Sequence, residues 1–269
     1  MKIKMAAIDL DGTLLHNDMS ISEYSKEIIH EMENRGVKIV VATGRMFDSA
    51  RPMAEALGLS DTPLICYTGA WVMMSHTGTP ILQEGVDIPV AEKILAIARE
   101  RNWLVHTFFD DYIYLPEPSE TEEKYQKYRT KKVQYLGESF YHPEKKPTRL
   151  IFASESFLVR NEIRRTIESF FSHEVETVFP GDDFVDVHKK GINKGWAIQR
   201  LCRMWQISED QVVAFGNTEN DVSMLRRAGV SYAVANADQI AKDAATYICD
   251  SNENDGVAKI LEQYLKEDI

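Results

Sequence analysis

Short apolar runs alternate with helix-type patterns near the start of the chain. Ile3–Asp9 and Val37–Ala42 are apolar stretches of strand length that end in turn or cap residues, which is typical of buried parallel strands. Between them, Glu23–Arg35 has apolar residues at helical spacing and follows Ser22, a residue type that caps helices. A second helical pattern covers Met46–Leu57. This order of strand, helix, strand and helix predicts a parallel sheet with crossover helices.

The pattern changes in the middle of the chain. After a predicted strand over Pro63–Tyr67 and a hairpin, helical patterns alternate with paired short strands, and one charged helical pattern covers Glu120–Lys132. This mixture predicts an inserted α+β domain of roughly one hundred residues, over 83–189. The alternating pattern then resumes, so residues 1–82 and 190–269 together form the predicted α/β domain. Aromatic residues that alternate along the inserted strands are expected to lie mostly in that domain's core: Trp103, Phe108, Phe109, Tyr112 and Tyr114.

Composition narrows the class of function. The chain has 44% hydrophobic and 27% charged residues, which is ordinary globular composition, and its formal net charge is −11 without a long basic stretch. Nucleic-acid binding therefore has little electrostatic support. The three cysteines are far apart without a C-x-x-C motif, no apolar run could span a membrane, and a strand pattern begins directly at the N-terminus. We expect a soluble cytoplasmic protein with no membrane partner, and the sequence does not predict its oligomeric state.

Two aspartates stand at the end of the first predicted strand. Asp9 and Asp11 are separated by one residue and are followed by Gly12 and Thr13. Residues two apart in an extended chain point the same way, and open α/β sheets bind ligands at the carboxyl ends of their strands. Two carboxylates held together are costly without a cation, so the pair suggests a divalent metal with one carboxylate free to attack. Asp-Gly is also a common turn, and this stretch alone leaves structure and chemistry open.

A hydroxyl residue stands at the corresponding place after the second predicted strand. Thr43 precedes Gly44 and Arg45, and a helical pattern follows. The hydroxyl and the two following amides form a suitable receiver for an oxyanion at a helix N-terminus. Alternatively, Thr43 caps the helix.

Polar side chains recur at helix starts after the inserted domain. Lys194 begins one predicted helix, and the run Asn217–Asp221 precedes another. The alternative for Lys194 is a solvated lysine, although the helix dipole disfavours a cation at that end. The alternative for Asn220 and Asp221 is a pair of helix caps. His188 reaches the expected cleft only if the strand alternation places it on that face.

Four motifs in order resemble the haloacid dehalogenase superfamily of phosphohydrolases. They read D-L-D-G-T (9–13), A-T-G-R (42–45), G-I-N-K-G (191–195) and G-N-T-E-N-D-V-S-M-L (216–225). Their order and spacing, and the insert between the second and third motifs, are similar to those of Cof-type sugar-phosphate phosphatases with a C2-type (C2B-like) cap. The resemblance covers the whole chain. It implies an α/β Rossmann-like core with a parallel sheet and an inserted α+β cap domain for substrate specificity.

The resemblance also implies a role for each motif residue. Asp9 is expected to be the nucleophile that forms an aspartyl-phosphate, and Asp11 to protonate the leaving alkoxide and later deprotonate water. Thr43 and Lys194 are expected to hold the oxygens of the transferring phosphoryl group. Further phosphate or substrate contacts are implied at Leu10, Gly12, Gly44, Arg45, Asn220 and His188. The implied ligands of Mg²⁺ are Asp9, Asp11, Asn217 and Asp221.

Two positions depart from the family pattern. The family usually has aspartate where Asn217 stands, and it often has asparagine where Thr68 precedes Gly69. An amide oxygen still ligates a cation, but the site loses one negative charge. We therefore expect weaker Mg²⁺ binding than in an Asn217→Asp variant. The change at Thr68 puts one contact near the phosphate in question.

The leading hypothesis is a Mg²⁺-dependent phosphatase that acts on a small phosphorylated metabolite such as a sugar phosphate. A phosphomutase on the same scaffold is one alternative, and a non-catalytic phosphometabolite-binding protein is another, favoured by Asn217. Three basic residues of the inserted domain are candidates for binding a second anionic group of the substrate, and are otherwise solvated: Arg149, Lys189 and Lys190.

Overall fold

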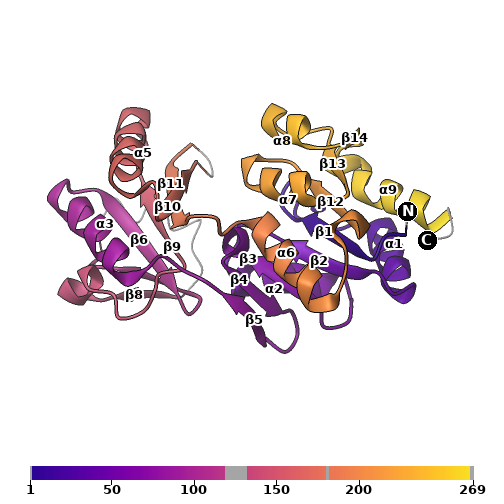
Figure 1. The fold of residues 1–269 in the computed structure, drawn as a ribbon, viewed down its shortest axis with the longest axis horizontal. Coiled ribbons are helices and arrows are strands. Elements are labelled where there is room, and N and C mark those ends of the chain that lie inside the picture. The colour runs from indigo at the N-terminus through magenta and orange to yellow at the C-terminus, as the bar shows by residue number, and fades with distance from the viewer. Residues whose placement is uncertain (1, 119–131, 180–181, 267–269) are drawn as a thin grey trace. The chain divides into compact units, whose positions relative to one another are not determined.

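The chain folds into two compact units (Figure 1). The computed structural model describes residues 2–118, 132–179 and 182–266. The core unit comprises Met1–Leu82 and Asn193–Ile269, and the inserted unit is Gln83–Ile192. Each unit contains its own sheet, so each is described separately.

An eight-stranded sheet forms the centre of the core unit, in the order β14-β13-β12-β1-β2-β3-β4-β5. The strands from β14 to β3 are parallel to their neighbours, whereas β4 is antiparallel to β3. All five residues of β1 are buried, which explains why this strand is apolar up to its terminal aspartate. The strands are β1 (Met5–Asp9), β2 (Lys38–Ala42), β3 (Pro63–Cys66), β4 (Trp71–Met74), β5 (Pro80–Gln83), β12 (Val212–Gly216), β13 (Val230–Val234) and β14 (Tyr247–Cys249).

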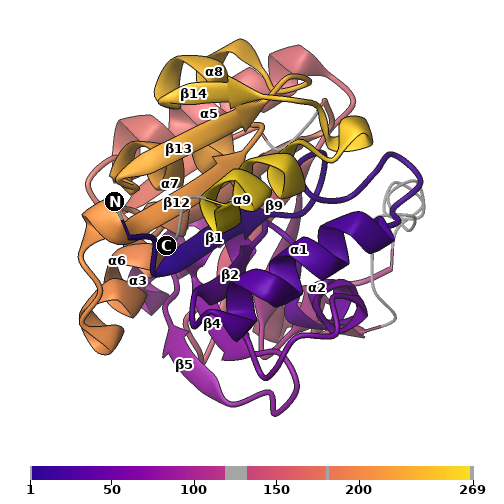
Figure 2. The same cartoon turned by 90° about the vertical axis from the view of Figure 1, so that its right-hand side faces the viewer.

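Six helices of the core unit cover this sheet. Helix α1 packs beside α9, as Figure 2 shows, and α7 packs against both α6 and α8. Side-chain caps define two of the helix starts: the Ser22 hydroxyl accepts from the Ser25 amide at 3.0 Å, and Asn193 Oδ1 accepts from the Trp196 amide at 2.9 Å. The helices are α1 (Glu23–Asn34), α2 (Phe47–Ala56), α6 (Lys194–Trp205), α7 (Val222–Arg227), α8 (Gln239–Ala244) and α9 (Gly256–Lys266).

The inserted unit contains a six-stranded sheet in the order β10-β11-β9-β6-β7-β8. Its pairs are antiparallel except for β7 with β8. Helices α3 (Ile88–Glu100) and α5 (Phe157–Phe171) share one apolar core with this sheet, in which Ile94 and Ile163 meet Val105 and Phe152. The strands are β6 (Leu104–Phe109), β7 (Tyr112–Leu115), β8 (Val133–Tyr135), β9 (Arg149–Ala153), β10 (Val175–Val178) and β11 (Phe184–Lys189).

The aromatic residues of the inserted strands divide between two environments. Tyr114 belongs to the apolar core, and Trp103, Phe109 and Tyr112 pack against it. Phe108 is buried outside this cluster, and the guanidinium carbon of Arg149 lies 4.8 Å from the centre of its ring. The expectation of a mostly structural role is therefore confirmed for four of the five aromatic residues.

The sequence patterns missed one strand and left one prediction without an outcome. Strand β8 was not predicted, because three residues are too few to define a strand pattern. The charged helix predicted over Glu120–Lys132 lies almost entirely outside the described residues.

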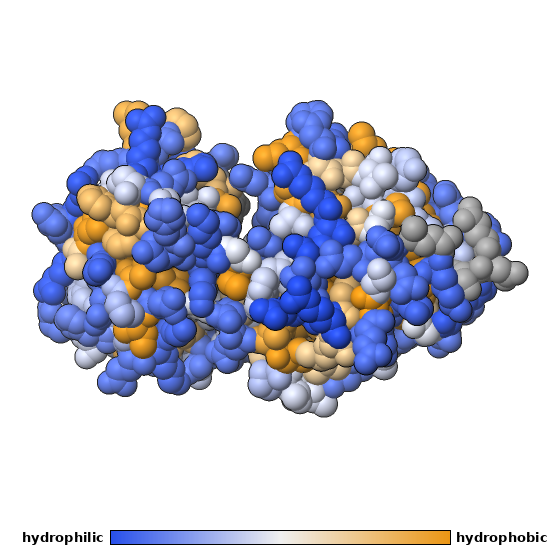
Figure 3. Space-filling model, in the orientation of Figure 1, coloured by the Kyte–Doolittle hydropathy of each residue, from blue (hydrophilic) through white to orange (hydrophobic). Residues whose placement is uncertain are grey.

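The surface is mainly hydrophilic in the face that Figure 3 shows, with small hydrophobic patches between the polar side chains. Within the described residues, no helix has the length and apolar composition needed to cross a membrane. Cys66, Cys202 and Cys249 are all buried and form no disulfide within the described residues. Burial raises the pKa of the Cys202 thiol to about 11, so its reactive thiolate is disfavoured.

Candidate active site

The carboxyl ends of three parallel strands converge at one edge of the core sheet. Asp9 is the last residue of β1 and pairs in register with Ala42 of β2. On the other side of β1, Ile8 pairs with Phe215 of β12. Residues that directly follow these strands therefore start from neighbouring positions. This register brings together the first, second and fourth sequence motifs.

A buried lysine connects the remaining motif to this edge. Lys194 begins α6, and its Nζ atom lies 2.7 Å from Asp9 Oδ1 and 2.6 Å from Asp221 Oδ1. Lys194 and Asp221 have no exposed surface, and Asp9 is 4% exposed. Asp9 and Asp221 are 212 positions apart in the sequence, so the fold brings distant residues together in this cluster. The interpretation of Lys194 as a solvated lysine is thus wrong.

The other oxygen of Asp221 fixes the loop that follows β12. Asp221 Oδ2 accepts hydrogen bonds from the backbone amides of Asn217 at 2.8 Å and Thr218 at 3.1 Å. The bond to Thr218 is one half of a capping box on the short 3₁₀ turn Glu219–Asp221. Asp221 therefore caps this turn through one oxygen and contacts Lys194 through the other.

The buried cluster carries an excess of negative charge. It contains two carboxylates and one ammonium group, all inaccessible to solvent or nearly so. Burial raises the pKa of Asp9 to about 7, and the neighbouring charge of Asp221 adds to this effect, while Lys194 partly opposes it. Burial alone would lower the pKa of Lys194, but the two carboxylates outweigh it and hold that pKa above its usual value. Lys194 is therefore charged at neutral pH, whereas Asp9 is partly protonated, and a cation bound beside the two carboxylates would favour their ionised forms.

Asp11 has a different partner. Strand β1 ends at Asp9, so the strand alternation does not determine where Asp11 points. Two hydrogen bonds join its carboxylate to Arg45, from Nε to Oδ2 at 2.7 Å and from Nη2 to Oδ1 at 2.5 Å. The Asp11 side chain is 46% exposed, in contrast to buried Asp9. A bidentate pair of this kind sets the orientation of the Asp11 carboxylate.

Thr43 is buried directly after β2. Its Oγ1 accepts a hydrogen bond from the backbone amide of Arg45 at 3.1 Å. Helix α2 begins only at Phe47, and its N-cap residue Met46 makes no side-chain cap bond. The interpretation of Thr43 as the cap of this helix is therefore wrong. The Arg45 amide, one of the expected oxyanion donors, is already used by Thr43.

Close contacts place the loop residues around Asp9. Gly12 has a φ angle of +73°, and a Cβ atom there would lie 2.5 Å from Nδ2 of Asn217, so the two loops meet at a position that only glycine fits. A Cβ atom at Gly44 would lie 3.5 Å from both Asn220 Nδ2 and Thr68 Oγ1. The hydroxyl of Thr68 thus lies beside the second motif.

The donors of this edge fit a hard divalent cation. Within the described residues, no three His, Cys, Asp or Glu side chains form a cluster that could hold a metal ion. The candidate ligands include only two buried carboxylates, those of Asp9 and Asp221, because Asp11 is engaged by Arg45 and position 217 is an amide. A small set of oxygen donors that includes two carboxylates suits Mg²⁺, because this cation retains several of its waters. The remaining donors would be the amide oxygen of Asn217 and the backbone carbonyl of Asp11.

His188 lies in β11 of the inserted unit rather than in the core cluster. It is 4% exposed. Its Nε2 atom lies 3.7 Å from Glu176 Oε2, and its Nδ1 atom lies 4.0 Å from Asp186 Oδ1. Its neighbours within this unit are therefore acidic.

The chain belongs to the haloacid dehalogenase-like hydrolases, whose family profile matches residues 6–261. It is a phosphoric monoester hydrolase of the Cof type, and the predicted family, enzyme class and fold class are confirmed. Small phosphorylated compounds are the substrates of this class, and its members generally use Mg²⁺.

Individual relatives match over nearly their full length. A 5-amino-6-(5-phospho-D-ribitylamino)uracil phosphatase of Bacillus subtilis is 29% identical over 268 residues, covering 98% of this chain and 96% of the relative. A pyridoxal phosphate phosphatase of Escherichia coli is 26% identical over 281 residues, covering 98% of this chain and all of the relative. The crystal structure of a Thermotoga maritima protein superimposes with a TM-score of 0.82 at 26% identity, covering 97% of each chain.

Proposed function

We propose that this chain is a Mg²⁺-dependent phosphatase that hydrolyses a small phosphorylated metabolite through an aspartyl-phosphate on Asp9. The observation that carries the proposal is the buried contact of Lys194 with both Asp9 and Asp221. This contact holds the Asp9 carboxylate in a fixed place beside the positive charge of Lys194. A nucleophile and an anion-stabilising group are thereby preorganised at one edge of the sheet.

In the first step, a carboxylate oxygen of Asp9 forms a bond to phosphorus as the bond to the leaving oxygen breaks. Asp11 gives its proton to that leaving oxygen, so that the product departs as an alcohol. In the second step, Asp11 takes a proton from water, whose oxygen attacks the phosphorus and releases Asp9 and inorganic phosphate. Arg45 orients the ionised Asp11 carboxylate for the proton uptake of the second step through its bidentate hydrogen bonds.

The phosphoryl group itself is held by the residues around Asp9. Lys194 and Thr43 neutralise and position its oxygens, and the loops carrying Leu10, Gly12, Gly44 and Asn220 provide further contacts. Asp9, Asp221, Asn217 and the carbonyl of Asp11 would hold Mg²⁺. When bound, the cation offsets the charge of the phosphoryl oxygens and of the two buried carboxylates.

The charges of the inserted unit favour a leaving group without a second phosphate. Arg149 pairs with buried Asp186 at 3.2 Å, and Lys189 pairs with Glu84 at 3.0 Å. Lys190 donates to the carbonyl of Ser172 at 2.5 Å. Each of the three basic candidates is therefore already engaged within its own unit. We infer that the inserted unit, acting as the cap, selects a leaving group that carries no phosphate.

Within the inserted unit, His188 is the residue that we propose to contact the leaving group. Its Nδ1 atom is buried, and it has no hydrogen-bond partner among the described residues. A buried polar atom without a partner is costly, and a hydroxyl or N–H group of a substrate would satisfy it.

Release of inorganic phosphate tests this function directly. With Mg²⁺ present, we expect turnover of p-nitrophenyl phosphate, loss of that turnover in EDTA, and recovery on adding the metal back.

A panel of metabolites tests the inferred leaving group. The kcat/KM of each monophosphate should exceed that of the corresponding bisphosphate by at least about tenfold, which is the scale of one lost favourable contact. Absence of turnover on every ester would refute the proposed phosphatase, and preferred hydrolysis of bisphosphates would refute the inferred leaving group. Transfer of phosphate to a sugar instead of water would indicate a mutase.

Replacing Asn217 with aspartate should strengthen Mg²⁺ binding. The Asn217 side chain lies against Gly12, and Asn217→Asp would add a carboxylate to a site that already has an excess negative charge. We expect the Mg²⁺ concentration at half-maximal activity to fall by about threefold or more. Isothermal titration of Mg²⁺ into both proteins provides a second readout. The control Asn254→Asp adds the same charge on an exposed turn. Equal midpoints for the wild type and Asn217→Asp would exclude this residue as a ligand.

A further inference from the structure

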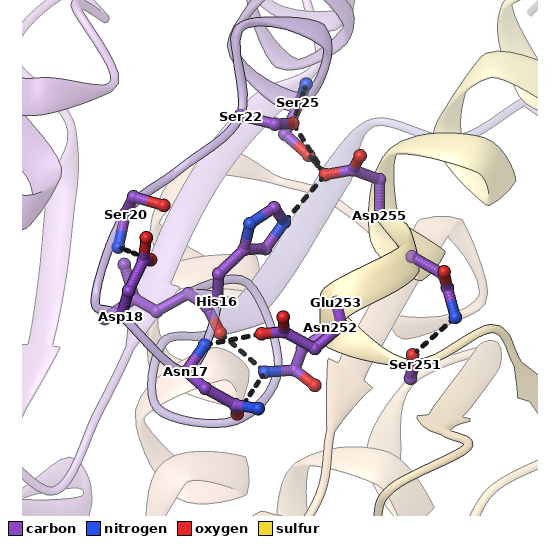
Figure 4. Close-up of polar contacts among 12 residues, drawn as sticks. His16, Asn17, Asp18, Ser20, Ser22, Ser25, Ser251, Asn252, Glu253 and Asp255 are labelled. Carbon is purple, nitrogen blue, oxygen red and sulfur yellow. Dashed lines mark hydrogen bonds and ion pairs between the residues drawn. The ribbon is translucent and has the colours of Figure 1, made fainter.

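The loop that follows the nucleophile strand is held by a segment from the far end of the chain. Residues 12–22 contact residues 236–255 through hydrogen bonds that span more than two hundred positions of sequence, and Figure 4 shows most of the residues involved. The residues that the C-terminal segment contributes to these contacts lie outside the four sequence motifs. The segment is therefore a second support of the catalytic loop.

Asn236 is the contact nearest to the active site. Its Nδ2 donates to the carbonyl of Gly12 at 2.8 Å, and its Oδ1 accepts from the backbone amide of Asn252 at 3.1 Å. A backbone carbonyl can only accept and a backbone amide can only donate, so the orientation of this side-chain amide is unambiguous. Asn236 thus joins the peptide between Gly12 and Thr13 to the turn that begins at Asn252.

Asn252 extends the support along the loop. It is 3% exposed, and its Nδ2 donates to the carbonyl of Leu15 at 2.9 Å and to Oδ1 of Asn17 at 3.3 Å. The neighbouring Glu253 accepts from the amide of Asn17 at 2.6 Å. As Figure 4 shows, these bonds run from one short turn to one side of the loop. A bond of a buried amide to a backbone carbonyl is costly to lose, because both groups would be left without partners.

Asp255 closes the far end of the loop. Its Oδ1 accepts from Ser22 Oγ at 2.6 Å and Ser25 Oγ at 2.9 Å, and it lies 3.2 Å from Nε2 of His16. Three side chains therefore converge on one carboxylate oxygen, as Figure 4 shows. The start of α1 and the end of the loop are joined to the same segment as Gly12.

The same segment also contacts the other loop of the site. The amide of Asp238 donates to the carbonyl of Asn217 at 2.8 Å. Asn217 in turn lies against Gly12, whose left-handed backbone leaves no room for a side chain. Residues 236–238 thus hold both loops that approach Asp9, one through a side chain and the other through the backbone.

We propose that Asn236 and Asn252 are positioning residues for phosphoryl transfer, which act by holding the loop 12–17 beside Asp9 and Asn217. This inference rests on the proposed function. Neither residue touches the reacting atoms; they act through the Gly12 carbonyl and the backbone that carries Asp11. Displacement of a catalytic group by about 1 Å can cost on the order of a hundredfold in rate, so loss of this support should appear in kcat.

Two substitutions of Asn236 test the proposal. Asn236→Ala removes both hydrogen bonds, while Asn236→Asp keeps the acceptor for Asn252 but loses the donor to Gly12. Because Asn236 is exposed, both variants should fold. We expect kcat for p-nitrophenyl phosphate to fall at least tenfold in both, with KM changed less than threefold. Hydrogen exchange in peptides covering residues 10–17 should be accelerated. Asn254→Asp is the matched control, since the hydrogen bonds of Asn254 to other described residues go to Ser251 in the same turn.

The readouts separate positioning from a merely structural role. Unchanged kcat in both Asn236 variants would overturn the proposal, and so would a lower melting temperature with unchanged kcat for the folded enzyme. Accelerated exchange in residues 10–17 that also occurs in Asn254→Asp would overturn it as well. If the wild type hydrolyses no ester, the proposed function fails. Accelerated exchange confined to the Asn236 variants would then still support the role of this segment in holding the loop.

Discussion

Replacing Asp9 with asparagine should abolish turnover while leaving the fold intact. Asparagine has the same shape and still accepts a hydrogen bond from Lys194, but its amide cannot form the aspartyl-phosphate. We expect kcat for p-nitrophenyl phosphate to fall by about a thousandfold or more, as for the removal of other covalent nucleophiles. Rapid-quench measurement with a ³²P-labelled ester should detect labelled wild-type protein and no labelled variant.

Thermal stability distinguishes this loss from unfolding. In the wild type, Lys194 faces two buried carboxylates, and Asp9→Asn leaves it facing only Asp221. The neutral pair is better balanced, so without metal the variant should melt at the same temperature as the wild type or higher. Asp243→Asn, at an exposed position of α8, is the control for removal of a carboxylate. Turnover that survives in Asp9→Asn would exclude Asp9 as the nucleophile.

The central strands of the core sheet could be predicted from the sequence because β1, β2, β3 and β12 are almost entirely buried on both faces. Such strands are continuous apolar runs, and β1, β2 and β12 each end where a polar motif begins. The helical patterns over Glu23–Arg35 and Met46–Leu57 similarly predicted α1 and α2 to within one residue at each end. Parallel register then explains why residues of distant motifs meet at one edge.

The arrangement of the side chains at this edge could be predicted only in part. The family resemblance implied that Lys194 and Asp9 serve one site, but it did not imply the pairing of Asp11 with Arg45, because both lie in loops where no periodicity fixes direction. Asn236 was missed altogether. A single asparagine after a strand has no distinctive spacing, and its partner is a backbone carbonyl, which leaves no signal in the sequence.

Replacing Lys194 with methionine should damage both activity and stability. Methionine approximates the length of lysine without its charge, so Asp9 and Asp221 would remain buried with no cation between them. Breaking a buried pair by removing one partner typically costs about 3–5 kcal/mol of unfolding free energy. We also expect kcat to fall by about a hundredfold or more, because the phosphoryl oxygens lose a preorganised charge. Denaturant unfolding without metal and steady-state kinetics with Mg²⁺ measure the two effects.

A second substitution shows whether charge is the cause. Adding Asp221→Asn to Lys194→Met removes one of the two uncompensated carboxylates, so part of the lost stability should return while activity stays low. Lys259→Met is the matched control, because Lys259 forms a 2.7 Å pair with Asp250 on the surface of the same unit, where such pairs contribute about 0–1 kcal/mol. If Lys194→Met is as stable as Lys259→Met, the buried ammonium does not balance the two carboxylates. The central electrostatic feature of the proposed site, a buried ammonium that stabilises the two carboxylates beside which Mg²⁺ would bind, would then be wrong.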